Sequence, residues 1–143
     1  MKKILRAFLS QKIINIFWHL PKAVLANIYY GFPTRKLKVI GVTGTDGKTT
    51  TTNMIYQILK AAGKKVSMIS TVNAIIGGSS YDTGFHVTSP DLFMIQKFAK
   101  ISLDNGDEYL VLEVTSHALD QYRFWGIKFD IGVITNITHE HLD

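Results

Sequence analysis

The chain has 143 residues, of which 46% are hydrophobic, so it is long and apolar enough to form one domain with a buried core and is not disordered. It contains no cysteine, which excludes disulfides, thiol chemistry and cysteine-ligated zinc. The formal charge of +5 is unevenly distributed: residues 1–38 hold eight basic and no acidic residues, and the remainder holds eight basic and eleven acidic ones. The basic character belongs to the N-terminal segment, and no nucleic-acid partner is expected.

Residues 1–35 form a basic segment in which apolar residues recur at helical spacing. His19, Pro21 and Lys22 interrupt the longest apolar run, which argues against a membrane-spanning helix of about 20 apolar residues. The segment 31–33, Gly-Phe-Pro, is expected to end the helix. Two interpretations stay open: a helix or helical hairpin packed on this domain or another one, or a basic amphipathic segment, residues 1–31, in peripheral contact with an anionic membrane.

From residue 36 onward, strand-like runs alternate with helix-like runs. Strands are predicted within 36–44, 65–71, 108–116 and 130–138, helices within 49–62 and 89–105, and a hairpin within 71–84 that bends at Gly77-Gly78. This alternation predicts an α/β fold with a parallel sheet and flanking helices. The last two strands are apolar almost throughout, as expected for strands buried on both faces. Because the sequence stops just past a strand, we expect it to be part of a longer chain.

The stretch GVTGTDGKTTTT, residues 41–52, follows a predicted strand and opens a predicted helix, which is the context of a phosphate loop. Gly44 and Gly47 would let the backbone turn, Lys48 would reach the outer phosphates, and the Thr49 hydroxyl would bind Mg²⁺. The spacing departs from the common P-loop pattern, because Val42 stands where the first glycine is expected. The alternative is a turn that merely caps the helix.

Two further patterns concern charged residues near strand ends. Glu113 lies at the end of a predicted buried strand, where a carboxylate needs a partner, so it is either a salt-bridge member or a metal ligand. His139 and His141 invite a zinc interpretation, but no third ligand follows at suitable spacing.

Three ordered motifs resemble the Mur ligase family: the loop GVTGTDGKTTTT, then EVTSHALDQYR at 113–123, then TNITHEHLD at 135–143. The resemblance covers about residues 36–143 and is greatest to members that add the third residue of the peptidoglycan stem peptide to UDP-N-acetylmuramoyl-L-alanyl-D-glutamate. It implies a P-loop-containing central ATP-binding domain, incomplete at its C-terminus, preceded by the helical segment 1–35. That segment does not resemble the uridine-binding domain usual in the family.

The resemblance also implies roles for individual residues. Lys48, Glu113 and His141 are implied to be catalytic, and Thr49, Glu113 and His141 to bind Mg²⁺. Asp46 stands where the family often has asparagine. The residues implied to bind ATP are Gly44, Thr45, Asp46, Gly47, Lys48, Thr49, Thr50 and Asn136. The residues implied to contact the UDP-muramoyl substrate are Thr88, Ser89, Thr115, Gln121 and Arg123.

The implied reaction is ATP-dependent amide formation through an acyl phosphate, with UDP-N-acetylmuramoyl-dipeptide and an amino acid as substrates, in a cytoplasmic monomer or one at the inner face of the membrane. The family's carbamylated lysine and its C-terminal domain lie beyond the last motif, so we expect weak or no ligase activity from these residues alone. Two alternatives stay open. One is a sister amide ligase of the cyanophycin or folylpolyglutamate type, with EVTSHALDQYR arguing against the folate branch. The other is a non-catalytic nucleotide-binding module that docks on a membrane or partner.

Overall fold

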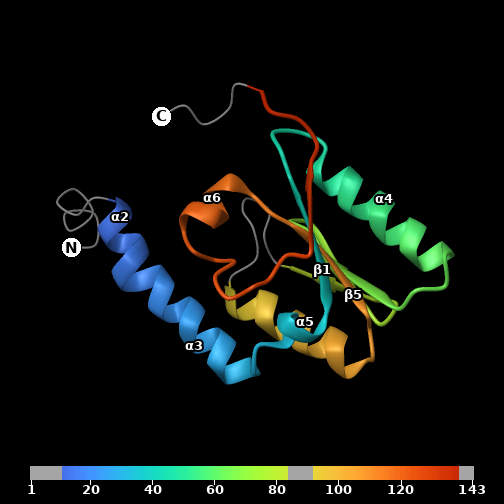
Figure 1. The fold of residues 1–143 in the computed structure, drawn as a ribbon, viewed down its shortest axis with the longest axis horizontal. Coiled ribbons are helices and arrows are strands. Elements are labelled where there is room, and N and C mark those ends of the chain that lie inside the picture. Colours follow the sequence, from blue (N-terminus) through green and yellow to red (C-terminus); the bar gives the residue numbers. More distant parts are fainter. Residues whose placement is uncertain (1–10, 84–91, 139–143) are drawn as a thin grey trace.

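The computed structural model describes residues 11–83 and 92–138 of the chain (Figure 1). The strands are β1 (Lys38–Thr43), β2 (Val66–Ile69), β3 (Asn73–Ile76), β4 (Ser79–Asp82), β5 (Tyr109–Glu113) and β6 (Ile131–Ile134). The helices are α2 (Gln11–Ile14), the π-helical turn η1 (Asn15–His19), α3 (Leu20–Tyr30), the 3₁₀ turn η2 (Pro33–Lys36), α4 (Lys48–Ala61), α5 (Leu92–Asp104) and α6 (Ser116–Asp120). The predicted start of α5, at residues 89–91, lies outside the described residues.

The six strands form one sheet in the order β4-β3-β2-β5-β1-β6. Its parallel part consists of β2, β5, β1 and β6, whereas β3 and β4 extend it as an antiparallel hairpin. Both turn residues of that hairpin, Gly77 and Gly78, have positive φ values of 57° and 82°, which suits the tight turns that match strand twist. The predicted α/β class and the predicted hairpin are both confirmed.

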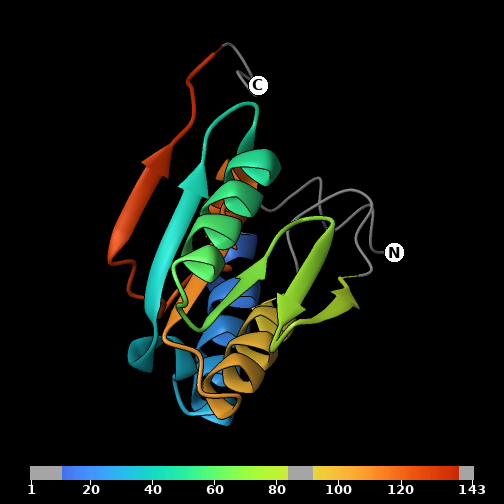
Figure 2. The ribbon, with the colours of Figure 1, turned by 90° about the vertical axis from the view of Figure 1, so that its right-hand side faces the viewer.

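Helices cover both faces of the sheet because neighbouring strand residues point to opposite sides. On one face, Tyr56 of α4 packs in a cluster with Val42 and Val111 of the central strands. On the other, Ile95 and Phe98 of α5 pack in a cluster that includes the alternate strand residues Val39, Leu110 and Leu112. Figure 2 shows the sheet between these two helices. The site described below therefore rests on a sheet supported from both sides.

The expectation that both late strands are buried on two faces is correct for β5 and wrong for β6. All but the first residue of β5 are buried, whereas Ile131 and Ile134 of β6 are 54% and 63% exposed. Within the described residues, β6 lies at the sheet edge and pairs only with β1. An apolar run does not distinguish a central strand from an edge strand, which explains the error.

The N-terminal segment is helical from residue 11 to residue 30, as one stretch rather than a hairpin, and α3 packs against α5. Pro21 falls at the start of α3, directly after the π-helical turn, where the regular hydrogen-bond ladder is already interrupted. Gly31 ends the helix in the left-handed conformation, with φ of 70°. The predicted break at residues 31–33 is confirmed, and so is packing on this domain.

The buried central strand yields a stability prediction. Leu112→Ala should lower the free energy of unfolding by about 3 kcal/mol, because the side chain is fully buried and its removal leaves a cavity. Chemical denaturation measures the change. Leu25→Ala is the control, since that leucine is 58% exposed and should cost less than about 1 kcal/mol. Equal losses in the two variants would contradict the placement of Leu112.

Candidate functional site

The loop 44–47 joins the end of β1 to the start of α4, at the carboxyl edge of the sheet. Gly44 and Gly47 have φ values of 139° and 77°, which residues other than glycine rarely adopt. Gly47 is the N-cap of α4, and no side chain among the described residues caps that end of the helix. The N–H groups of the first turn and the helix dipole are therefore directed at the loop, as an anion site requires.

The segment that follows β6 holds this loop in place. The Asn136 side-chain oxygen accepts from the Asp46 N–H at 2.9 Å, and its backbone oxygen accepts from the Thr45 N–H at 3.2 Å. The Thr135 hydroxyl donates to the Asp46 carbonyl at 2.7 Å. The approach is so close that a Cβ on Gly44 would stand 2.1 Å from the Thr135 hydroxyl oxygen. Hydrogen bonds thus hold the backbone of Asp46 in place, although Asp46 as a whole residue is exposed to solvent.

Lys48, the first residue of α4, folds its side chain back over the loop. Its ammonium donates to the Gly44 carbonyl at 2.7 Å and to the Thr45 carbonyl at 2.5 Å. Both acceptors belong to the turn that would surround a phosphate. The ammonium therefore already lies at the loop, where a phosphate oxygen could replace one of the carbonyls as its partner.

Glu113, the last residue of β5, is only 2% exposed. Its carboxylate accepts from the Thr49 hydroxyl at 3.0 Å, from the Thr71 N–H at 3.1 Å and from the Thr71 hydroxyl at 3.2 Å. All three donors are neutral, so the salt-bridge alternative is not found in the described part of the chain. A buried carboxylate surrounded by neutral donors is well suited to accept a cation as a further partner.

The oxygen atoms at this point fit a magnesium ion. The Thr49 hydroxyl and one Glu113 carboxylate oxygen are 3.0 Å apart. Neighbouring ligands of an octahedral Mg²⁺, at bonds of about 2.1 Å, stand about 3 Å apart. Carboxylate and hydroxyl oxygens are also the hard donors that this ion prefers. The third predicted ligand, His141, lies outside the described residues.

The predicted substrate residues occupy the segment after β5. The Thr115 hydroxyl accepts from the Ala118 N–H at 3.3 Å and so caps the short helix α6, which the sequence interpretation missed. The Arg123 Nε donates to the Gln121 side-chain oxygen at 2.9 Å. Thr88 and Ser89 lie outside the described residues. The structure thus brings the loop, Glu113 and Asn136 together and places three substrate candidates on the segment that continues from Glu113.

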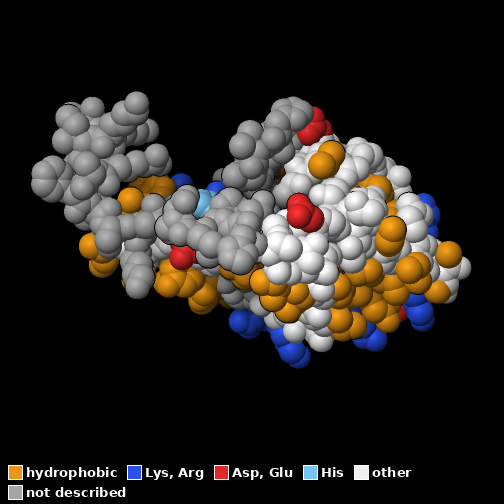
Figure 3. Space-filling view, turned by 90° about the horizontal axis from the view of Figure 1, so that it is seen from above, with side chains coloured by type: hydrophobic (Ala, Val, Ile, Leu, Met, Phe, Trp, Pro, Cys, Tyr) orange, Lys and Arg blue, Asp and Glu red, His pale blue; other side chains and the backbone are white. Residues whose placement is uncertain are grey.

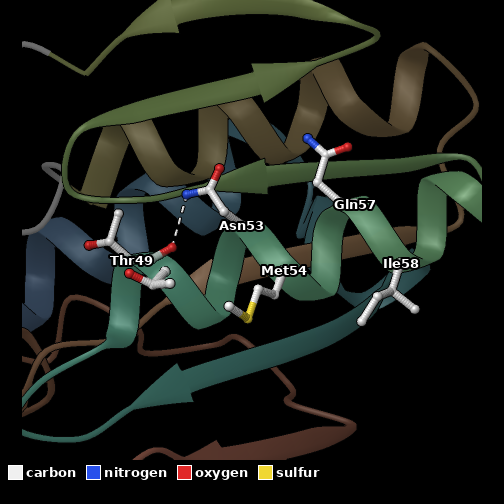
Figure 4. A pocket seen from close by; sticks show the side chains of 6 residues that line it. Thr49, Asn53, Met54, Gln57 and Ile58 are labelled. Atoms are coloured by element: carbon white, nitrogen blue, oxygen red, sulfur yellow. Dashed lines mark hydrogen bonds between the residues drawn. The ribbon is translucent and has the colours of Figure 1, made fainter.

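An open groove extends from the phosphate loop along α4 (Figure 4). Asn53 lies one turn after Thr49, and its amide donates to the Thr49 carbonyl at 2.9 Å. The residues that line the groove are Thr49, Thr50, Asn53, Met54, Gln57 and Ile58. The predicted ATP residues Thr49 and Thr50 therefore face space that a ligand can enter.

Two site residues were missed at the level of sequence. Thr71 donates twice to Glu113, and Thr135 ties the loop to the end of β6. Both could have been found, because each lies within two residues of the end of an apolar strand-like run whose carboxyl end meets the same edge of the sheet.

Residues 42–143 match the family model of the Mur ligase middle domain. Among curated relatives, the UDP-N-acetylmuramoyl-L-alanyl-D-glutamate–2,6-diaminopimelate ligases of Geobacillus thermodenitrificans and Clostridium tetani are each 47% identical to this chain over 121 residues. The ligase of that name from Parabacteroides distasonis is 41% identical over 120 residues. These alignments cover 84% to 85% of this chain but 24% of each relative, so the chain spans about a quarter of the relatives' length.

A solved structure of a UDP-N-acetylmuramoyl-L-alanyl-D-glutamate–2,6-diaminopimelate ligase superimposes with a TM-score of 0.60 and 26% sequence identity, over 75% of this chain and 21% of that one. The similarity in fold agrees with the match to the family model. That match begins within β1 and includes the phosphate loop, Glu113 and Asn136. The chain belongs to the Mur ligase family.

Proposed function

We propose that this chain carries the ATP and Mg²⁺ site, and part of the UDP-muramoyl site, of an amide ligase of peptidoglycan precursor synthesis. The ligase would add an amino acid to UDP-N-acetylmuramoyl-L-alanyl-D-glutamate, the substrate in the names of the relatives. The observation that carries the proposal is the hydrogen bond between the buried Glu113 carboxylate and Thr49, the second residue of the helix that follows the phosphate loop.

The loop residues would bind the phosphates of ATP. The first turn of α4 leaves its backbone N–H groups without a side-chain cap from the described residues, so they are available to an anion at the loop, and Lys48 adds a positive charge next to them. Thr49 and Glu113, with His141 as a predicted third ligand, would hold Mg²⁺, which neutralises phosphate charge. The remaining ATP contacts are proposed for Gly44, Thr45, Asp46, Gly47, Thr50 and Asn136.

The proposed reaction transfers the γ-phosphoryl group of ATP to a substrate carboxylate, giving an acyl phosphate and ADP. The incoming amine then displaces phosphate and forms the amide bond. Lys48 and the N–H groups of the first turn of α4 would stabilise the negative charge on the transferring group, because donors held near the loop before the reaction need little reorganisation. Arg123 would meet the carboxylate or diphosphate of the substrate, with Thr88, Ser89, Thr115 and Gln121 as further contacts.

The proposal includes a helical segment 1–35 and a central domain 36–143 in a cytoplasmic monomer. It also includes weak or absent turnover by these residues alone. A sister amide ligase of the same fold remains the alternative function. The names of the relatives favour the peptidoglycan ligase over that alternative.

A lysine substitution tests the phosphate loop. Lys48→Ala should weaken ATP binding by about 100-fold or more, because it removes a charge-assisted hydrogen bond to phosphate while leaving the core untouched. Isothermal titration calorimetry with the 143-residue chain measures the affinity. Lys60→Ala is the matched control, since Lys60 is exposed near the other end of α4 and should leave the affinity unchanged. Equal ATP affinity in Lys48→Ala and the unsubstituted chain would refute the phosphate site.

A second pair of substitutions tests the metal site. The unsubstituted chain should bind ATP more tightly with Mg²⁺ than with EDTA. Glu113→Gln or Thr49→Val should reduce that difference in affinity by about tenfold or more, because the first removes the negative charge of the carboxylate ligand and the second removes the hydroxyl ligand. Thr49→Ser keeps the hydroxyl and should keep the difference. Thermal unfolding checks that each variant is folded. A full Mg²⁺ effect in a folded Thr49→Val variant would exclude the hydroxyl as a ligand.

A further inference from the structure

The N-terminal helix, residues 11–30, packs on the domain with small and polar side chains. Asn15, Ala23, Ala26 and Asn27 are at most 2% exposed. Their spacing of three, four and eight residues places them on one face of a helix. A surface helix ordinarily buries its large apolar residues and exposes its polar ones, so this face is the opposite of what the pattern predicts.

The polar contacts of this inner face are specific. The Asn15 amide donates to the Asp120 backbone carbonyl at 2.9 Å and to its carboxylate at 2.8 Å. The Asn27 amide donates to the Trp125 carbonyl at 2.8 Å and packs on Gly126, where a Cβ would stand 2.9 Å from it. These contacts fix which face of the helix is turned toward the domain.

The outer face consequently presents the large apolar side chains to solvent. Phe17, Trp18, Leu25, Ile28 and Tyr29 are 76%, 60%, 58%, 61% and 78% exposed. Ile13 and Ile16 extend the same surface, at 41% and 46% exposed. Figure 3 shows hydrophobic side chains along the part of the molecule where this helix lies. Large apolar side chains exposed together on one helix are typical of an interaction site.

The sequence of the helix and of its flanking segments contains only basic charged residues. Eight basic residues lie within residues 1–38, and the first acidic residue of the chain is Asp46. The Lys22 ammonium lies 4.3 Å from the centre of the Trp18 ring, so a cation borders the apolar face itself. Arg35 and Lys36 are exposed just past the end of the helix. Asp120 contacts the helix from its inner side, where Asn15 occupies its carboxylate.

We propose that the outer face of helix 11–30 docks on an anionic lipid surface and lies in the plane of the interface. Tryptophan, tyrosine and lysine beside aliphatic side chains are the composition that places a helix at the headgroup boundary. No helix within the described residues is long and apolar enough to cross a membrane. A second copy of the chain could cover the apolar face, but it would bring the same basic charge and be repelled. An anionic lipid surface complements both the apolar outer face and the positive charge of the segment.

Docking would also position the candidate substrate segment. The inner face of the helix contacts Asp120 and Trp125, which flank Gln121 and Arg123. A helix held at the interface would therefore hold this segment close to the bilayer. The proposal goes beyond the ligase function and does not depend on it, since lipid binding requires neither ATP nor Mg²⁺.

Vesicle sedimentation of the 143-residue chain tests the proposal. The chain should sediment with vesicles of equal parts phosphatidylcholine and phosphatidylglycerol, and much less with phosphatidylcholine alone. The double variant Leu25→Gln with Ile28→Gln should weaken binding by about tenfold or more, because both side chains would leave the apolar layer. Lys22→Gln should weaken it by about fivefold.

A matched control uses the opposite side of the domain. Met54→Gln with Ile58→Gln replaces side chains of α4 that are 59% and 67% exposed, close to the exposure of Leu25 and Ile28, and should leave vesicle binding within about twofold of the unsubstituted chain. In a Trp125→Phe background, the Trp18 fluorescence should shift to shorter wavelength on anionic vesicles. Binding that is lost equally in both double variants would overturn the proposal, and so would the absence of binding to anionic vesicles. Light scattering that shows a dimer dissociated by the Leu25 and Ile28 changes, without lipid binding, would assign the face to a second copy instead.

Discussion

The arrangement of the site depends on one buried carboxylate. Glu113 ends the central strand β5, which lies between β1 and β2 in the sheet. Because the three strands are parallel, the segments that follow β1 and β2 arrive on either side of Glu113 and supply its donors, Thr49 and Thr71. A buried charge without such donors would lower the stability of the fold by several kcal/mol. The strand order is therefore needed to bring the donors to Glu113. The same strand order places the phosphate loop beside the candidate metal ligands.

The loop gains its shape from the end of a neighbouring strand rather than from its own side chains. Thr135 and Asn136 bind backbone groups of the loop from across the β1–β6 pair, and Gly44 permits the close approach. Val42 stands at the position of the first glycine in the common P-loop pattern. Its side chain is fully buried and packs in a cluster with Tyr56 of α4, so this position serves the core. The conformation of the loop is thus held by contacts within the protein, so the proposed binding of a phosphate would require little reorganisation.

Sequence patterns predicted the features governed by local rules. The alternation of elements, the glycine turns at Gly31 and Gly77 and the strand-end position of Glu113 all follow from periodicity, turn chemistry and the cost of burying a charge. The exposure of β6 and the short helix α6 were missed because each depends on tertiary context that periodicity does not encode. The face that the N-terminal helix turns toward the domain could not be predicted from the sequence, because it depends on long-range contacts. Its apolar stripe suggests an inner face, yet Asn15 and Asn27 find their partners in a segment 98 to 105 residues away.

That long-range pairing also changes how the N-terminal segment relates to the family domain. The match to the Mur ligase middle domain begins at residue 42, so helix 11–30 precedes it, yet the helix bonds to Asp120 and Trp125 inside it. Gly126 has no side chain, and any Cβ there would collide with Asn27, so the residues after α6 are shaped to receive this helix. A tether on a flexible linker would need no such fit. The segment is therefore packed as part of the same folded body as the phosphate loop, and any surface that holds the helix also orients the site.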